Sequence, residues 1–124
     1  MIAGPVSSLR SFYDKSRVFI APTRFAAGIA HKIHEAAASR LPCVTTPLIA
    51  GQVGWNALEL GIGASPEAFA EACVHAYSDE SRWTEMRDAA LDRVRVDCSP
   101  EQFDRVVGEV FVAAATAGRT YIPR

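Results

Sequence analysis

The chain has 124 residues, of which 49% are apolar and 22% are charged, and its formal net charge is −1. These values are typical of one ordinary cytoplasmic globular domain, and they provide no basic surplus for nucleic acid or acidic lipid. No apolar run approaches the ~20 residues of a membrane span, and the N-terminus has no signal-peptide core. The three cysteines are far apart and form no CxxC pair, which favours a reducing compartment over disulfides or zinc.

The first elements in chain order are a predicted helix and a predicted buried strand. A short helix is expected over Val6–Tyr13, with apolar residues on one side. Arg17–Ala21 contains a continuous apolar run, as expected of a parallel strand that is covered on both faces. Pro22 ends this strand because proline cannot donate to a ladder of hydrogen bonds. Phe25–Gly28 then supplies a turn with little side-chain bulk.

A helix is expected to begin at Gly28, and its residues separate by face at about 100° per residue. One arc is apolar and is expected to face the sheet. The other arc is polar and lies at a helix N-terminus, where free N–H groups and a partial positive charge suit phosphate. Two interpretations stay open, namely a solvated face with a Lys32–Glu35 pair or an anion site. The apolar arc comprises Ile29, Ile33, Ala36 and Ala37, and the polar arc comprises Gly28, His31, Lys32 and Glu35.

Two further strands are predicted after this helix. Cys43–Thr46 is short and β-branched, and Leu60–Gly63 carries a weaker strand pattern. The stretch between them, Leu48–Asn56, is expected to be a loop. Ligands of open α/β sheets bind at the carboxyl ends of parallel strands, so Thr45, Thr46 and this loop are expected beside the glycine turn.

The remainder of the chain is predicted to be helical. Ser65-Pro66-Glu67 and Ser99-Pro100-Glu101 each supply an N-cap, a proline at the first helical position and an early acid. Cys73 and Tyr77 are expected in the core, and His75 at the solvent edge. The last helix ends at Gly118 and has an apolar stripe of Phe103, Val106, Val107, Val110, Phe111 and Ala114. We therefore predict a single α/β domain over residues 1–124, a Rossmann-like three-layer α/β/α fold with a small parallel sheet and a helical part at about 65–118.

The sequence contains no motif of several other enzyme classes. There is no G-x-S-x-G elbow, no Walker lysine after a glycine loop and no G-x-G-x-x-G. His31 and His34 are three residues apart, whereas a zinc-binding helix uses an i, i+4 pair. We therefore expect no metal and no cofactor, and no catalytic residue is assigned. The Gly28 turn with its polar helix face is the candidate site that remains.

Many residues between Ala21 and Thr46 follow one family pattern without gaps. They are Ala21-Pro22, Arg24-Phe25, Gly28-Ile29, Lys32, Glu35-Ala36, Leu41-Pro42, Val44 and Thr45-Thr46. On these residues the chain resembles the donor-binding segment of retaining glycosyltransferases of the GT-B fold, the glycosyl transferases group 1 family. A looser likeness extends from about Leu9 to Phe103. The resemblance implies a partial GT-B C-terminal domain that binds a nucleotide-diphosphate sugar for glycosyl transfer.

The resemblance also implies a role for several residues. The diphosphate would approach the small-residue turn, Lys32 would add positive charge, and Glu35 would hold ribose hydroxyls because a carboxylate accepts two O–H donors. Catalysis in this class would be mostly positioning and stabilisation of the leaving diphosphate. The candidate substrate-binding residues are Ala26, Ala27, Gly28, His31, Lys32, Glu35, Thr45 and Thr46.

Three departures from the family pattern affect this interpretation. Ala27 stands where many members carry an acid, and Arg40 stands where a glycine usually ends the helix. About two βα units and an acceptor-binding domain are also missing before Met1–Tyr13, so we expect a truncated fragment without turnover of its own. The Arg17–Ala21 strand would then be an open edge, available to a second copy in a homodimer or to the missing N-terminal segments. The alternative is a non-catalytic α/β module for binding or assembly. A flavodoxin-like response domain is not favoured, because no cluster of acids follows an early strand.

Overall fold

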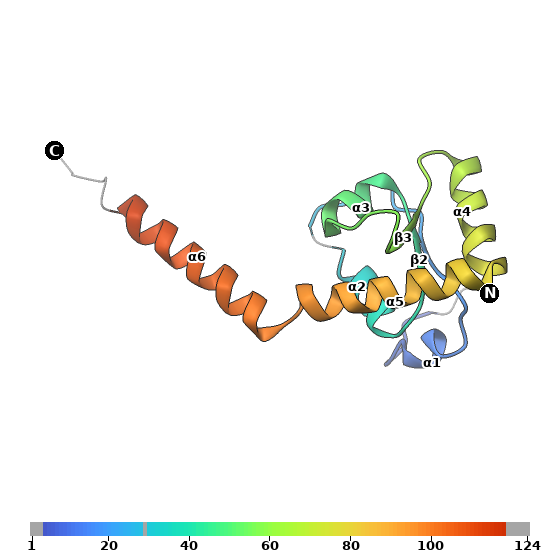
Figure 1. Cartoon of the computed structure of the whole chain (residues 1–124), viewed down its shortest axis with the longest axis horizontal. Helices are drawn as coiled ribbons and strands as arrows, with labels where there is room; N and C mark the ends of the chain where they lie inside the picture. Colours follow the sequence, from blue (N-terminus) through green and yellow to red (C-terminus); the bar gives the residue numbers. More distant parts are fainter. Residues whose placement is uncertain (1–3, 29, 119–124) are drawn as a thin grey trace. The chain divides into compact units, whose positions relative to one another are not determined.

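A computed structural model describes residues 4–28 and 30–118 of the chain. They divide into two compact units, one ending at Arg93 and the other beginning at Val94. Helix α5 crosses this boundary, so the second unit consists of the end of α5 and α6. The elements in chain order are α1 (Arg10–Tyr13), β1 (Phe19–Ala21), α2 (His31–Ala38), β2 (Cys43–Thr45), α3 (Pro47–Val53), β3 (Leu60–Ile62), α4 (Pro66–Ser78), α5 (Glu80–Asp97) and α6 (Pro100–Gly118) (Figure 1).

The three strands form one parallel sheet in the order β1-β2-β3. Ile20 of β1 stands in register with Val44 of β2, which in turn stands beside Gly61 of β3. The predicted α/β class, the small parallel sheet and the helical C-terminal half are therefore confirmed. Because β1 is at the end of the order, it has a hydrogen-bonded strand on one side only among the described residues.

The side chains of β2 alternate between two covered faces of the sheet. Val44 is fully buried in a cluster with Ala76 of α4 and Met86 of α5. Cys43 points to the opposite face, where its thiol donates to the Leu41 carbonyl at 3.4 Å and lies 4.0 Å from the Ile33 carbonyl of α2. Burial raises the pKa of the Cys43 thiol to about 12, so this cysteine is an inert core residue. Helices thus cover both faces of β2, as in a three-layer fold.

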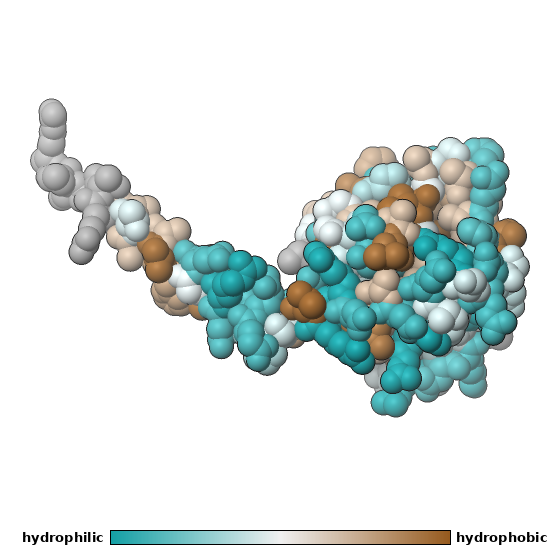
Figure 2. Space-filling view, in the orientation of Figure 1, coloured by the Kyte–Doolittle hydropathy of each residue, from teal (hydrophilic) through white to brown (hydrophobic). Residues whose placement is uncertain are grey.

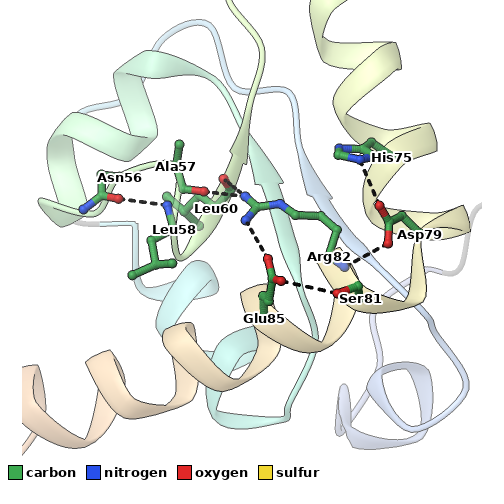
Figure 3. Close-up of polar contacts among 9 residues, drawn as sticks. All are labelled: Asn56, Ala57, Leu58, Leu60, His75, Asp79, Ser81, Arg82 and Glu85. Carbon is green, nitrogen blue, oxygen red and sulfur yellow. Dashed lines mark hydrogen bonds and ion pairs between the residues drawn. The ribbon is translucent and has the colours of Figure 1, made fainter.

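Arg82, near the start of α5, fastens the segment before β3 to the α4–α5 corner (Figure 3). Its guanidinium donates to the carbonyl oxygens of Ala57 and Leu60, the latter at 3.4 Å. Its backbone N–H donates to Asp79 Oδ1 at 3.0 Å, and Asp79 also pairs with His75 Nε2 at 3.2 Å. The exposed His75 therefore contributes to the corner through Asp79.

Helix α2 begins at His31, three residues later than the predicted start at Gly28. Gly28 has φ +99°, a backbone conformation that belongs to the left-handed side and cannot continue into a right-handed helix. Ala30 is the N-cap, and no side chain caps it. Ile29, predicted on the buried arc, lies outside the described residues. The rest of that arc, Ile33, Ala36 and Ala37, is buried as expected.

The predicted loop over Leu48–Asn56 contains a helix instead, α3. Pro47 occupies its first helical position, where the missing N–H costs nothing, and Thr46 precedes it in extended conformation. Gly54 ends α3 with φ +70° in the left-handed conformation. Of the two glycines that suggest a loop, Gly51 is therefore a residue within the helix and Gly54 is its C-cap.

The first helix and the first strand are both shorter than predicted. Helix α1 starts at Arg10 rather than Val6, with Leu9 as an N-cap that makes no side-chain capping bond. Ser8 Oγ accepts a hydrogen bond from the Arg10 N–H at 3.2 Å. Strand β1 covers only Phe19–Ala21. Tyr13, the buried residue of α1, packs edge-on against the Phe19 ring, with 6.1 Å between the centroids. The short helix is thereby attached to the face of the sheet that also carries α2.

Candidate functional site

The chain from Pro22 to Ala30 joins the carboxyl end of β1 to α2, and α3 and the end of β2 hold it in place. Thr46 Oγ1 donates to the Thr23 carbonyl at 2.7 Å, and Gln52 Nε2 of α3 donates to the Ala26 carbonyl at 3.4 Å. Side chains are small over 26–28, and these residues are exposed. The turn is therefore accessible, and the hydrogen bonds from Thr46 and Gln52 hold its backbone in place.

A hollow of about 320 Å³ lies between this turn and the start of α2, and we name it the Lys32 hollow. Lys32 Nζ donates to Thr23 Oγ1 at 2.7 Å, which places the ammonium over the loop. Since no side chain caps α2, the partial positive charge of its N-terminus acts in the same place. The lining residues are Ala26, Ala27, Gly28, Ala30, His31, Lys32, Ile49 and Gln52. Small residues, a cation and an uncapped helix end together suit an anion such as phosphate.

Glu35 lies in a different hollow, of about 670 Å³, formed against the N-terminal segment and named the Glu35 hollow. Burial raises the pKa of Tyr13, and the Glu35 carboxylate raises it further through its charge and through a hydrogen bond with the Tyr13 hydroxyl. Arg10 and Arg40 also line this hollow. The Lys32–Glu35 pair expected of a solvated polar face is not formed, because Lys32 bonds to Thr23 instead. The Lys32 hollow does not include Glu35 and the Glu35 hollow does not include Lys32, although both residues lie on the polar side of α2.

The two threonines at the end of β2 differ in accessibility. Thr45 is fully buried, and its hydroxyl has no hydrogen-bond partner among residues 4–28 and 30–118. Thr46 is half-buried and lines a third hollow, of about 630 Å³, where the carboxyl ends of all three strands meet. Arg24 and Phe25 line its other side, and the Phe25 side chain is 91% exposed. A bound molecule can therefore reach Thr46, while Thr45 lies behind the protein surface.

Sequence reasoning missed two residues that shape the site. Gln52 was assigned to a loop, yet it projects from α3, holds the Ala26 carbonyl and lines the Lys32 hollow. The sequence predicts no contact of Tyr13 outside the first helix, yet the Glu35 carboxylate contributes to raising the pKa of its hydroxyl. No local pattern signals either contact, since both join segments that are more than twenty residues apart.

The described part of the chain contains neither a candidate metal site nor a candidate membrane span. No group of three or more His, Cys, Asp or Glu side chains is arranged so that it could hold a metal ion. No helix there combines the length and the apolar character that a membrane crossing requires.

Parallel strands whose carboxyl ends surround hollows, one of them at a helix N-terminus, define an open α/β protein, a class in which ligands bind at the strand ends. Comparison with protein families gives the narrower identity. Residues 1–79 match the family described as glycosyl transferases group 1, and the chain belongs to this family. Neither the curated proteins nor the solved structures gave a match. The matched region ends at Asp79, after α4, so α5 and α6 lie beyond it.

Proposed function

We propose that the first unit binds a nucleotide-diphosphate sugar, as the donor half-site of a glycosyltransferase. Membership of the family supports a sugar donor as the class of ligand. The observation that carries the proposal is the Lys32 hollow, because it combines an accessible small-residue turn, an uncapped helix N-terminus and an ammonium group. The diphosphate would lie along Ala26, Ala27 and Gly28, with Lys32 and His31 beside it.

In this proposal Glu35 binds ribose hydroxyls from the neighbouring hollow. An ionised carboxylate accepts hydrogen bonds from two adjacent hydroxyls. A donor bound in this way would extend past the start of α2 and contact both hollows. Thr46 would contact the ligand from the strand ends, whereas buried Thr45 would support the sheet. We assign no catalytic residue, and we expect no glycosyl transfer by the isolated chain.

The proposal is tested by titrating the protein with UDP, GDP and UDP-sugars in a calorimeter. Lys32→Ala and Glu35→Ala should each weaken binding tenfold or more, which corresponds to about 1.4 kcal/mol. Lys15→Ala is a matched control, since Lys15 is the only other lysine of the chain and is exposed in the turn after α1. Equal affinity of Lys32→Ala and Lys15→Ala for the nucleotide would contradict the proposal.

A non-catalytic binding or assembly module is the second candidate function. Two observations favour it: Ala27 provides no carboxylate at the turn, and Tyr13 already engages the Glu35 carboxylate. Under this alternative none of the tested nucleotides binds, while the fold and its association surfaces remain. The titration therefore separates the two candidates.

We further propose that the open edge of β1 is an association surface. Ile20 is 53% exposed, and beside it lies a largely apolar groove of about 460 Å³ between β1 and α4. Tyr77, predicted in the core, is instead 61% exposed on this groove, with the Arg17 guanidinium 5.6 Å from its ring. An extended segment could pair with the free backbone groups of β1 and place an apolar side chain in the groove. This segment would come from a second copy or from further chain.

Hydrogen exchange of the Val18 and Ile20 amides tests this proposal, because the Phe19 N–H between them already donates to the Pro42 carbonyl at 2.9 Å. A paired edge protects amides that an open edge leaves to solvent, so protection should rise with protein concentration or on addition of the partner segment. Ile20→Asp should abolish that rise, whereas Leu58→Asp, at an equally exposed leucine outside the groove, should not. Protection that stays the same at all concentrations and with every added segment would overturn the proposal.

A further inference from the structure

Helix α6 carries a continuous apolar face that the second unit leaves uncovered. Ser99 Oγ caps the helix by accepting the Gln102 N–H at 3.1 Å, and the 19 residues span about 28 Å. No residue over 94–117 is buried, so this unit has no core of its own. Hydrophobic residues are visible along α6 in Figure 2. The face comprises Phe103, Val106, Val107, Val110, Phe111 and Ala114, and among these Phe103 is 67% and Phe111 71% exposed.

Such a face needs a partner, because a helix in water draws most of its stability from packing its apolar side. The charges of α6 indicate what kind of partner this is. Three acids, Glu101, Asp104 and Glu109, oppose a single cation, Arg105, which in turn pairs with Glu109 at 3.1 Å. Helices that lie on lipid surfaces instead carry many cations on the polar side. A protein surface of similar shape is therefore the better match.

The helix is complementary to itself when two copies run antiparallel. Its first half presents large apolar residues, and its second half is rich in alanine. With the two helices crossing at Val110, Val106 of one copy faces Ala114 of the other, and Val107 faces Ala113. Large side chains then meet small ones, which allows close packing.

The charges favour the same arrangement. All the charged residues of α6 lie before Val110, and residues 110–118 carry none. In a parallel pair, Asp104 would lie near Asp104 of the other copy, and Phe103 would face Phe103 of the other copy. In an antiparallel pair, each acidic half lies along an uncharged half, and the two helix dipoles oppose each other favourably. We propose that α6 is a dimerisation helix, which pairs antiparallel with α6 of a second copy and crosses it at Val110.

Sedimentation velocity on the full chain over a wide concentration range tests the pairing. We expect a dimer that Val110→Asp weakens at least tenfold. Val112→Asp is the matched control, because Val112 is 68% exposed on the opposite side of α6 and should leave the dimer intact. A monomer at all concentrations, or equal association of Val110→Asp and Val112→Asp, would overturn the proposal.

Cysteine crosslinking under a mild oxidant tests the direction of the pair. In an antiparallel pair the exposed native Cys98 residues lie at opposite ends, roughly 35 Å apart, whereas two copies of residue 110 meet. Val110→Cys in a Cys98→Ser background should therefore form a covalent dimer, and the natural chain should not. A Cys98–Cys98 disulfide, or no crosslink at residue 110, would overturn the antiparallel arrangement. Nucleotide binding enters neither experiment, so failure of the donor-site proposal leaves this test unaffected.

Discussion

Helices α4 and α6 begin in the same way and end in different environments. Both open with Ser-Pro-Glu, and in each the serine hydroxyl accepts a backbone N–H of the first turn, at 3.2 Å in α4 and 3.1 Å in α6. Ala76 of α4 is 1% exposed beneath the sheet, while Val110, on the apolar face of α6, is 62% exposed. Capping and periodicity thus determine that a helix forms and which face is apolar. Whether that face is buried depends on a partner elsewhere.

An aspartate on the apolar face of α4 should destabilise the first unit more than any other change, whereas an aspartate on the apolar face of α6 should not. Ala76→Asp would bury an unpaired carboxylate next to Val44 and Met86, so we expect the first unit to lose about 3–5 kcal/mol of unfolding free energy. Val110→Asp should leave the unfolding of this unit unchanged. Urea unfolding followed by fluorescence of the Trp55 and Trp83 side chains, both in the first unit, measures this difference. Equal loss of stability in the two variants would show that α6 is part of the same core.

Removal of the caps is expected to have a smaller effect. Ser65→Ala should destabilise the first unit by about 1 kcal/mol, because the Ala68 N–H loses its acceptor. Ser99→Ala should lower helicity without changing the unfolding of the first unit. Circular dichroism together with the same tryptophan fluorescence separates the two outcomes. A loss of first-unit stability in Ser99→Ala would contradict the distinction between the helices.

Arg40, which follows the C-cap of α2, has a backbone conformation that suits glycine better than arginine. Arg40 has φ +63°, and the Leu41 and Arg40 N–H groups donate to the Ala36 and Ala37 carbonyls at 3.1 and 2.9 Å, as in a Schellman motif. Arg40→Gly should therefore stabilise the first unit by about 0.5–1 kcal/mol, since glycine adopts this conformation without steric cost. Arg40→Ala removes the same charge but keeps the strain, so it should give no such gain in thermal unfolding.

The smallest expected effect is a loss of stability at alkaline pH. Burial and the Glu35 carboxylate raise the pKa of Tyr13, so the folded chain holds this proton more tightly than the unfolded chain does. The resulting stability is complete below the ordinary tyrosine pKa of about 10, and it is lost as the pH rises through the higher folded value. Urea unfolding over this range should show the loss in the natural chain and not in Tyr13→Phe. An identical pH dependence in the two proteins would contradict the raised pKa of Tyr13.

The sequence predicts those parts of this fold whose causes are local. An apolar run located β1, a short β-branched segment located β2, and a weaker strand pattern located β3. Ser65 and Ser99 marked the starts of two helices, because capping depends on neighbouring residues. Helix α3 was missed because Gly51 and Gly54 suggest a loop. Only the packing of Ile49 and Ala50 against the sheet makes that segment a stable helix.

The candidate site was predictable as a region and not in its details. The spacing of Lys32 and Glu35 correctly put both on the polar side of α2. Their separation into two hollows follows from contacts with Thr23 and Tyr13, which come from other elements. Periodicity along one helix contains no information about such distant neighbours.

Amide NMR during titration with UDP or GDP tests whether a nucleotide diphosphate binds at the turn before α2. We expect the largest shifts at Ala26, Ala27, Gly28 and Lys32, smaller ones at Glu35, and none at Val112 on α6. Shifts confined to α6 or to Phe25 and Phe69, which line the hollow at the strand ends, or no shifts with any nucleotide, would contradict such binding.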